Sequence, residues 1–115
     1  MQESLHIFKA DFFKALSNPA RIHILELLRD GELSVTRLQA KLKIDSSSVS
    51  QHLSVLRNKN IVYARKSGTT VYYAVSDPEI FELLDVARKI FNKQLLNTRS
   101  TLEQLEVDDL KNIAS

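Results

Sequence analysis

Apolar residues recur at helical spacing through the first third of the chain. Over Leu5–Leu16 they predict a first helix, which the tripeptide Ser17-Asn18-Pro19 ends. Asn18 is a favourable N-cap and Pro19 is a favourable first helical residue. A second helix is therefore predicted from Pro19 to the stop at Asp30-Gly31.

Two further helices follow, with a short turn between them. Glu32-Leu33 fits a very short strand, after which Ser34 caps a third helix, Val35–Leu42. The turn Lys43-Ile44-Asp45 leads into a fourth helix, Ser46–Asn58, which has two contrasting faces. The apolar face carries Val49, Leu53 and Leu56, and the uncharged polar face carries Ser47, Gln51, Ser54 and Asn58. A short turn before a helix with a polar outer side is typical of a helix-turn-helix.

The β-branched and tyrosine-rich runs between Ile61 and Val75 predict a two-stranded hairpin. Gly68 supplies the positive φ that a tight turn needs, and we expect Arg65 and Lys66 at the tip. A hairpin after a helix-turn-helix is a wing, whose cations can reach the sugar-phosphate backbone. The alternative is an edge strand that its charges protect from aggregation.

A long final helix is predicted after Ser76-Asp77-Pro78, because apolar residues keep a helical rhythm and no Gly or Pro interrupts them. We expect it to reach about Leu105 and the acidic tail, Glu106–Ser115, to fray. The first and last helices carry more apolar surface than one small domain covers, which favours a dimer interface over plain internal core. The candidate interface residues are Leu5, Phe8, Phe12, Ile80, Leu84, Ala87 and Phe91.

Together these elements predict one mainly α domain with a small β-hairpin, a winged helix-turn-helix of five or six helices that forms a homodimer. The helix-turn-helix covers about residues 34–58, the wing about 61–75, and the dimerisation helices about 5–16 and 78–105. The length of 115 residues and a charged fraction of 26% suit a single globular domain.

Composition excludes several kinds of chemistry. The chain has no cysteine, so disulfides, thiolate metal sites and cysteine nucleophiles are excluded. No apolar run approaches the roughly 18 residues of a membrane span, and the first residues lack the pattern of a signal peptide. A cytoplasmic location without membrane contact is therefore expected.

Charge is distributed unevenly along the chain. Ala20–Val75 holds nine Lys and Arg against four Asp and Glu, a balance of +5, whereas the remainder holds seven against ten, a balance of −3. A basic middle between acidic flanks indicates a polyanion partner for the middle, although solvated surface charge explains the count equally well.

The polar face of the fourth helix suits base edges, because Ser meets donors or acceptors and Gln can make a bidentate contact. Serines at a helix start can instead act as caps, but one residue suffices for capping and the surplus favours nucleic acid. The candidate DNA-binding residues are Ser46, Ser47, Ser48, Ser50, Gln51, Ser54, Arg57, Arg65 and Lys66. Double-stranded DNA is the expected partner.

Four ordered motifs resemble those of the ArsR/SmtB family of winged-helix repressors. They are the segment from Phe12 to Leu28, the tetrapeptide Glu32-Leu-Ser-Val, the segment from Ser48 to Leu56, and Gly68-Thr-Thr-Val-Tyr-Tyr. The resemblance covers about Phe8 to Leu96. It implies a prokaryotic homodimer that binds operator DNA and releases it when an inducer, often a metal ion, binds. It also places Ser46, Ser47, Ser50 and Gln51 near bases and assigns Arg65 and Lys66 to the wing.

The chain departs from this family at its metal-sensing positions. Ser34 and Thr36 stand where the arsenic and cadmium sensors have two cysteines. Asp77 matches the zinc and nickel sensors, but Glu79, Ile90 and Lys93 replace the other ligands of that site. An isoleucine cannot ligate and a lysine repels a cation, so neither site is expected.

No metal site or cofactor is expected from the other residues. The three histidines, His6, His23 and His52, lie on different predicted helices without ligand spacing. We expect His52 to pack or donate a hydrogen bond at the edge of the core. The inducer, if one exists, is not a thiolate-bound metal.

The sequence thus predicts a sequence-specific transcriptional regulator of the repressor type, a homodimer on an inverted-repeat operator. Catalysis is not expected, because caps and helix faces account for the Ser, His and Asp residues and there is no glycine-rich phosphate loop. Two alternatives remain: a winged helix that binds a protein or RNA, and a repressor that responds to a partner protein or to its own expression level.

Overall fold

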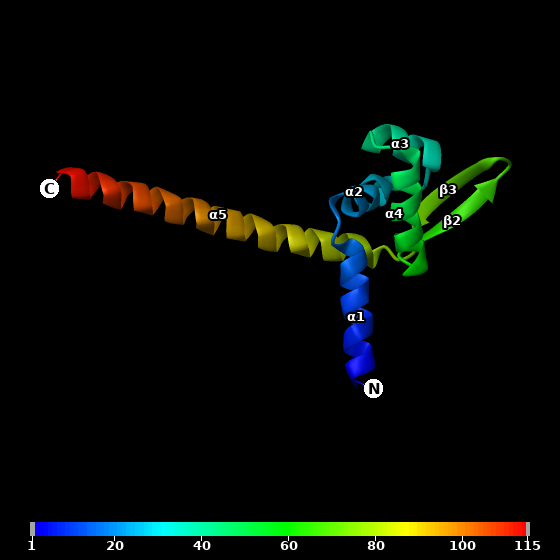
Figure 1. Ribbon diagram of the computed structural model, residues 1–115, viewed down its shortest axis with the longest axis horizontal. Coiled ribbons are helices and arrows are strands. Elements are labelled where there is room, and N and C mark those ends of the chain that lie inside the picture. Colours follow the sequence, from blue (N-terminus) through cyan, green and yellow to red (C-terminus); the bar gives the residue numbers. More distant parts are fainter. Residues whose placement is uncertain (1, 115) are drawn as a thin grey trace. The chain divides into compact units, whose positions relative to one another are not determined.

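The structure is a computed structural model that describes residues 2–114 and the side chains of residues 4–112. Its elements are α1 (Gln2–Leu16), α2 (Pro19–Leu27), the 3-10 turn η1 (Leu28–Asp30), β1 (Leu33–Ser34), α3 (Val35–Leu42), α4 (Ser46–Asn58), β2 (Val62–Ser67), β3 (Thr70–Val75) and α5 (Glu79–Ala114) (Figure 1). Contacts divide the chain into two compact units, Met1–Phe81 and Glu82–Ser115. The first contains the whole winged helix-turn-helix.

Side-chain caps fix the ends of the short helices, as the sequence predicts. The Asn18 side chain accepts hydrogen bonds from the backbone N–H groups of Ala20, at 2.9 Å, and Arg21, at 3.3 Å. Ser34 Oγ accepts one from the N–H of Arg37 at 3.1 Å and starts α3. Gly31 follows η1 with a φ of 134°, which a residue with a Cβ rarely adopts.

The core of the first unit lies between α2, α3, α4 and the sheet. The predicted inner face of α4 is confirmed, because Val49, Leu53 and Leu56 are at most 1% exposed. The buried apolar residues are Ala15, Leu16, Ile24, Leu25, Leu28, Leu38, Val49, Leu53, Leu56, Ile61, Val62 and Ile80. This burial fixes the rotation of α4 and therefore which of its side chains face outward.

The hairpin forms a three-stranded antiparallel sheet with β1, in the order β1-β3-β2. The short strand lies at Leu33–Ser34, one residue later than predicted, because Leu33 pairs with Tyr73. The prediction that Arg65 and Lys66 form the tip is wrong. Both lie within β2, paired with Tyr72 and Val71, and the turn itself is made by Gly68, with a φ of 63°, and Thr69.

Helix α5 is longer than the sequence suggested. The tail expected to fray after Leu105 is helical as far as Ala114, and Ser115 lies outside the described residues. The Asp77 carboxylate accepts a hydrogen bond from the Glu79 N–H at 2.9 Å and caps its start. The tail contains the helix formers Glu106, Leu110, Lys111 and Ala114, and it has no Gly or Pro to stop the helix. No helix in the described part of the chain combines the length and apolar character needed to cross a membrane.

Candidate nucleic-acid interface

The outer face of α4 is polar and open. Among the candidate residues, Ser46, Ser47, Ser50, Gln51, Ser54 and Arg57 are exposed, whereas Ser48 is half-buried. All but Arg57 are uncharged, so no ionic partner has to be displaced before a base edge approaches. Because α4 contacts β2, this face and the hairpin belong to one unit (Figure 1).

Two of the serines at the start of α4 serve the cap. The Asp45 carboxylate accepts hydrogen bonds from the Ser48 N–H at 3.0 Å, the Ser48 hydroxyl at 2.7 Å and the Ser47 hydroxyl. These bonds, the one from Ser47 first, lower the pKa of Asp45 from 3.8 to about 2. Fewer serines are therefore spare for nucleic acid than the sequence suggested. Ser47 and Ser48 can still accept a hydrogen bond, but their protons are engaged.

Arg65 is held against the sheet rather than free on the wing. Its guanidinium donates to the Glu32 carboxylate through two nitrogens, at 3.0 and 2.5 Å, and lies 4.7 Å from the centre of the Tyr72 ring. The hydrogen bonds from Arg65 lower the pKa of Glu32, and Glu32 raises the pKa of Arg65. Both groups thus stay charged at neutral pH, and Glu32 offsets part of the Arg65 charge.

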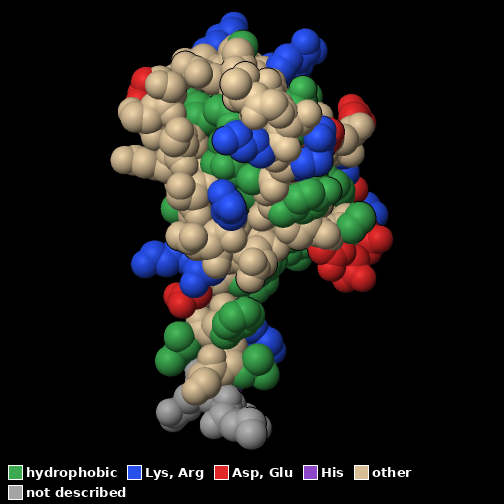
Figure 2. Space-filling view, turned by 90° about the vertical axis from the view of Figure 1, so that its right-hand side faces the viewer, with side chains coloured by type: hydrophobic (Ala, Val, Ile, Leu, Met, Phe, Trp, Pro, Cys, Tyr) green, Lys and Arg blue, Asp and Glu red, His purple; other side chains and the backbone are tan. Residues whose placement is uncertain are grey.

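Lys66 is exposed on the same strand. Side chains alternate across a strand, so Lys66 lies on the sheet face opposite Arg65. Seen from the hairpin side, Lys and Arg side chains gather among uncharged polar and hydrophobic ones (Figure 2). The basic part of the candidate interface is therefore the side of the molecule that carries the hairpin, and not the hairpin tip alone.

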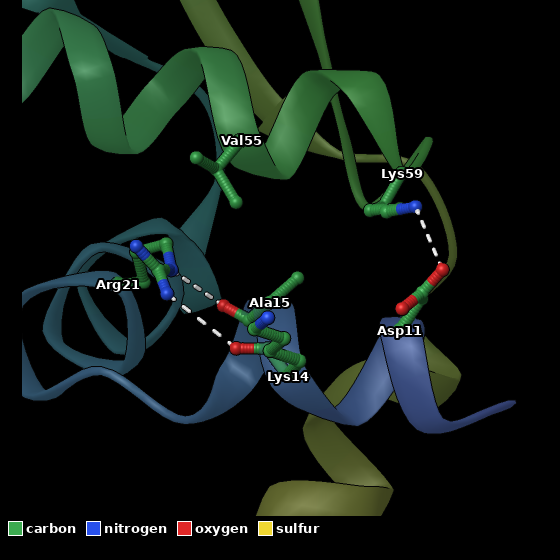
Figure 3. Close-up of a pocket in the computed structure, with 6 residues that line it drawn as sticks. All are labelled: Asp11, Lys14, Ala15, Arg21, Val55 and Lys59. Atoms are coloured by element: carbon green, nitrogen blue, oxygen red, sulfur yellow. Dashed lines mark hydrogen bonds and ion pairs between the residues drawn. The ribbon is translucent and has the colours of Figure 1, made fainter. Parts of the chain in front are cut away.

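A cavity of about 300 Å³ lies behind α4, between that helix and α1 (Figure 3). It is lined by Asp11, Lys14, Ala15, Arg21, Val55 and Lys59. The charges around it are largely used within the protein: Lys59 Nζ lies 3.8 Å from the Asp11 carboxylate, and Arg21 donates to the backbone oxygens of Ala15 at 2.6 Å and Lys14 at 3.4 Å. These contacts tie the C-terminus of α1 to α2 and α4.

His52 contributes to the same junction. Its Nδ1 lies 3.3 Å from Arg21 Nη1, and because a guanidinium has only donors, Nδ1 accepts. The sequence placed His52 correctly at the margin of the core, where it is half-buried, but the expected donor is an acceptor at this nitrogen. Within residues 4–112 no group of three His, Asp or Glu side chains has the geometry to hold a metal ion.

The candidate dimer residues differ in how much surface they offer. On α1, Leu5 is 53% and Phe8 70% exposed, and on α5 Phe91 is 59% exposed. Phe12, Leu84 and Ala87 are half-buried. Ile80 is only 7% exposed and packs inside the first unit, so it was misassigned to an external face.

A model of the arsR family of bacterial regulatory proteins matches residues 18–64, from the cap of α2 through α4 into β2. The uncharacterized HTH-type transcriptional regulator Rv0081 of Mycobacterium tuberculosis is 44% identical over 104 residues, which cover 90% of this chain and 91% of the relative. The chain belongs to the ArsR family. As a member it is a winged helix-turn-helix regulator of transcription.

Other relatives agree with this assignment. The transcriptional activator HlyU of Vibrio cholerae is 37% identical over 78 residues, 68% of this chain and 72% of the relative. The crystal structure of Rv0081 superposes with a TM-score of 0.76 at 45% identity and covers 81% of this chain and 94% of that one. A homodimeric winged helix-turn-helix domain of Mycobacterium bovis, Mb0332, gives a TM-score of 0.74 at 28% identity and covers 82% and 87%. None of these names is that of an enzyme.

Sequence reasoning missed three residues that shape the interface: Glu32, Tyr72 and Arg21. Glu32 and Tyr72 are 40 positions apart in the sequence, and both contact Arg65 in the folded sheet. No local pattern reports such a contact. For Arg21, a signal was available, because a long cation just after a helix end can reach the last carbonyls of that helix.

Proposed function

We propose that this ArsR-family protein is a homodimeric repressor that reads an inverted-repeat operator with α4, with half-sites about one helical turn apart. The observation that carries the proposal is the outer face of α4, which is exposed, hydrogen-bonding and held at a fixed rotation by a buried apolar face. A cytoplasmic location follows from this role.

In this proposal, the polar face of α4 contacts bases, and the cations beside it contact phosphates. Gln51 is suited to a bidentate contact with adenine, while Ser50 and Ser54 can serve as donors or acceptors for neighbouring bases. Lys66 on the wing and Arg57 at the end of α4 are placed for phosphates, which fix position without reading sequence. Backbone N–H groups at the start of α4 can contribute in the same way.

A homodimer supplies the second reading helix that a two-fold operator requires. The exposed Leu5 and Phe8 on α1 and Phe91 on α5 support it, because such apolar groups are costly to leave in water. Leu84 and Ala87 extend the proposed contact along α5. Mb0332, which has the same fold, is homodimeric.

The test is selection of sheared genomic DNA by the purified protein, followed by titration of the best fragment at several salt concentrations. We expect tight binding to an inverted repeat, with an affinity that falls steeply as salt rises. Weak binding without sequence preference would contradict the proposal. It would favour the alternative in which α4 and the wing bind a protein or RNA.

A further inference from the structure

The cavity behind α4 combines an apolar wall with cations at its edges. Val55 points into it from α4, while Arg21 and Lys59 lie on opposite sides of it (Figure 3). Val55 is half-buried, although Leu53 and Leu56 on the same helix are at most 1% exposed. Helix α1 contacts α4 but leaves this part of its apolar surface uncovered.

The lining has a positive charge that the protein does not fully use. Lys14, Arg21 and Lys59 face one acid, Asp11, which gives a balance of +2. Arg21 is engaged, because its guanidinium contacts two backbone oxygens and His52. Lys59 lies 3.8 Å from Asp11, and the two side chains are 40% and 51% exposed. Such a pair contributes little, so Lys59 can turn to another anion.

Lys14 is the second available cation. Within residues 4–112, no hydrogen bond or ion pair engages its ammonium group. Two ammonium groups beside an apolar wall suit a ligand that has one anionic group and an apolar body. A second negative charge on the ligand would be repelled by Asp11.

The volume of the cavity limits the size of such a ligand. At about 300 Å³ it lies at the lower end of the range for small-molecule sites, about 300–1,000 Å³. A molecule in liquid water occupies about 30 Å³, so the cavity equals about ten waters in volume. A nucleotide is too large to be enclosed, and inorganic phosphate would leave the Val55 wall in contact with water.

We propose that this cavity binds a small organic carboxylate, a monoanion with a compact apolar body. The apolar body lies against Val55 and the methyl group of Ala15, and the carboxylate meets the ammonium groups of Lys14 and Lys59. Burial of the apolar body and pairing of the charge then act together.

Binding in the cavity changes the contact between α1 and α4. Lys59, the C-cap residue of α4, forms an ion pair with Asp11 on α1. A carboxylate that draws Lys59 away breaks this link and places a second negative charge near Asp11. Because α1 is proposed for the dimer and α4 for base reading, the bound acid weakens operator binding. This regulatory step rests on the proposed function, whereas the binding site does not.

Titration of the full chain with phenylacetate, followed by backbone-amide NMR, tests the site. Signals of Lys14, Ala15, Val55 and Lys59 should shift and saturate in the millimolar range expected for so small a ligand. Phenylethanol and phenylethylamine, which keep the ring but lack the negative charge, should shift them several-fold less. Benzoate and hexanoate are titrated alongside. No saturable shift with any of the three acids, or an equal response to the amine, overturns the proposal.

Two variants locate the binding. Lys14→Gln should weaken phenylacetate binding several-fold, and Val55→Phe should abolish it by filling the cavity. Lys9→Gln is the matched control, because it removes the same charge from the same helix at a residue that does not line the cavity. An equal loss in Lys9→Gln would assign the effect to net charge. That result, or undiminished binding in both Lys14→Gln and Val55→Phe, overturns the site.

Operator binding by the wild type is measured in phenylacetate and in acetate at equal ionic strength, because salt alone weakens DNA binding. Phenylacetate should weaken it several-fold more than acetate, and equal effects overturn the regulatory step. If the NMR titration fails while the wild type binds its operator, only this inference is lost. If phenylacetate saturates the cavity but no operator is found, the site stands, and the proposed function and its regulation are lost.

Discussion

A single carboxylate, that of Glu32, determines how much of the Arg65 charge is available on the wing. The two side chains form a bidentate pair across the sheet edge, at 2.5 and 3.0 Å, and Tyr72 lies beneath the guanidinium. Such geometry orients Arg65 firmly, but the carboxylate repels a phosphate nearby. We therefore expect the pair to limit nonspecific affinity for DNA, while it links β2 to the residue that precedes β1.

The first prediction follows from this pair. Glu32→Gln removes the repelling charge and leaves a neutral hydrogen-bond acceptor, so binding to DNA of any sequence should tighten several-fold. The slope of log affinity against log salt should become steeper by up to about 0.9, the change expected for one more neutralised phosphate. Fluorescence anisotropy at several salt concentrations measures both quantities.

The matched control is Glu26→Gln, which changes the net charge equally. Glu26 forms its ion pair with Arg29, three residues along the chain, rather than with a cation of the hairpin. If Glu26→Gln tightened binding as much as Glu32→Gln, the effect would come from net charge alone. The role assigned to the Glu32–Arg65 pair would then be wrong.

The second prediction concerns pH and the α4 cap. Because the folded pKa of Asp45 is about 2, against 3.8 for an ordinary Asp, its ionised form stabilises the folded state. That contribution is complete above about pH 4 and disappears as the pH falls through 2. Asp45→Asn should flatten the acid limb of thermal stability between pH 4 and 2, as measured by circular dichroism. An acid limb of unchanged slope would contradict the assigned cap.

At the scale of the element, substitutions in α4 and in the wing should have different effects on DNA binding. Gln51→Ala should reduce discrimination between operator and mutated operator by about 1–3 kcal/mol, because it removes a base contact. Lys66→Ala should weaken binding to both DNAs about equally and reduce the salt slope by about 0.9. Competition titrations with the two DNAs at several salt concentrations separate the two effects. Undiminished discrimination by Gln51→Ala would mean that the reading face has been misassigned.

The elements themselves were largely predictable from sequence, because each follows from neighbouring residues. The Asn18 and Ser34 caps, the inner face of α4 and the hairpin turn at Gly68 are all confirmed. Predictions failed where a distant residue or the absence of a stop signal decided the outcome. Arg65 depends on Glu32, which lies 33 positions away, and α5 continues because nothing in its tail ends it.

At the scale of the whole molecule, assembly was the least predictable property. Periodicity shows that α1 and α5 have apolar stripes, but not whether another element of the same chain covers them. Ile80 belongs to such a stripe and is buried in its own unit, whereas Phe8 is 70% exposed. The exposed fraction of each side chain is known only from the folded structure. It therefore reduces the set of candidate dimer residues more than helical spacing in the sequence does.

The last prediction concerns Phe8, an exposed apolar residue of α1. Phe8→Glu should dissociate the dimer, because it places a charge where an apolar group is proposed to be covered. Binding to a full inverted repeat should then weaken by at least tenfold, while binding to an isolated half-site should not change, because α4 is intact.

Ile7→Glu is the control, since Ile7 is 63% exposed on the same helix but lies off the stripe of Leu5, Phe8 and Phe12. Sedimentation gives the mass, and titration of the two DNAs gives the affinities. Equal losses on both DNAs would show that the substitution damaged the domain, and a dimer that survived Phe8→Glu would move the interface away from this face of α1.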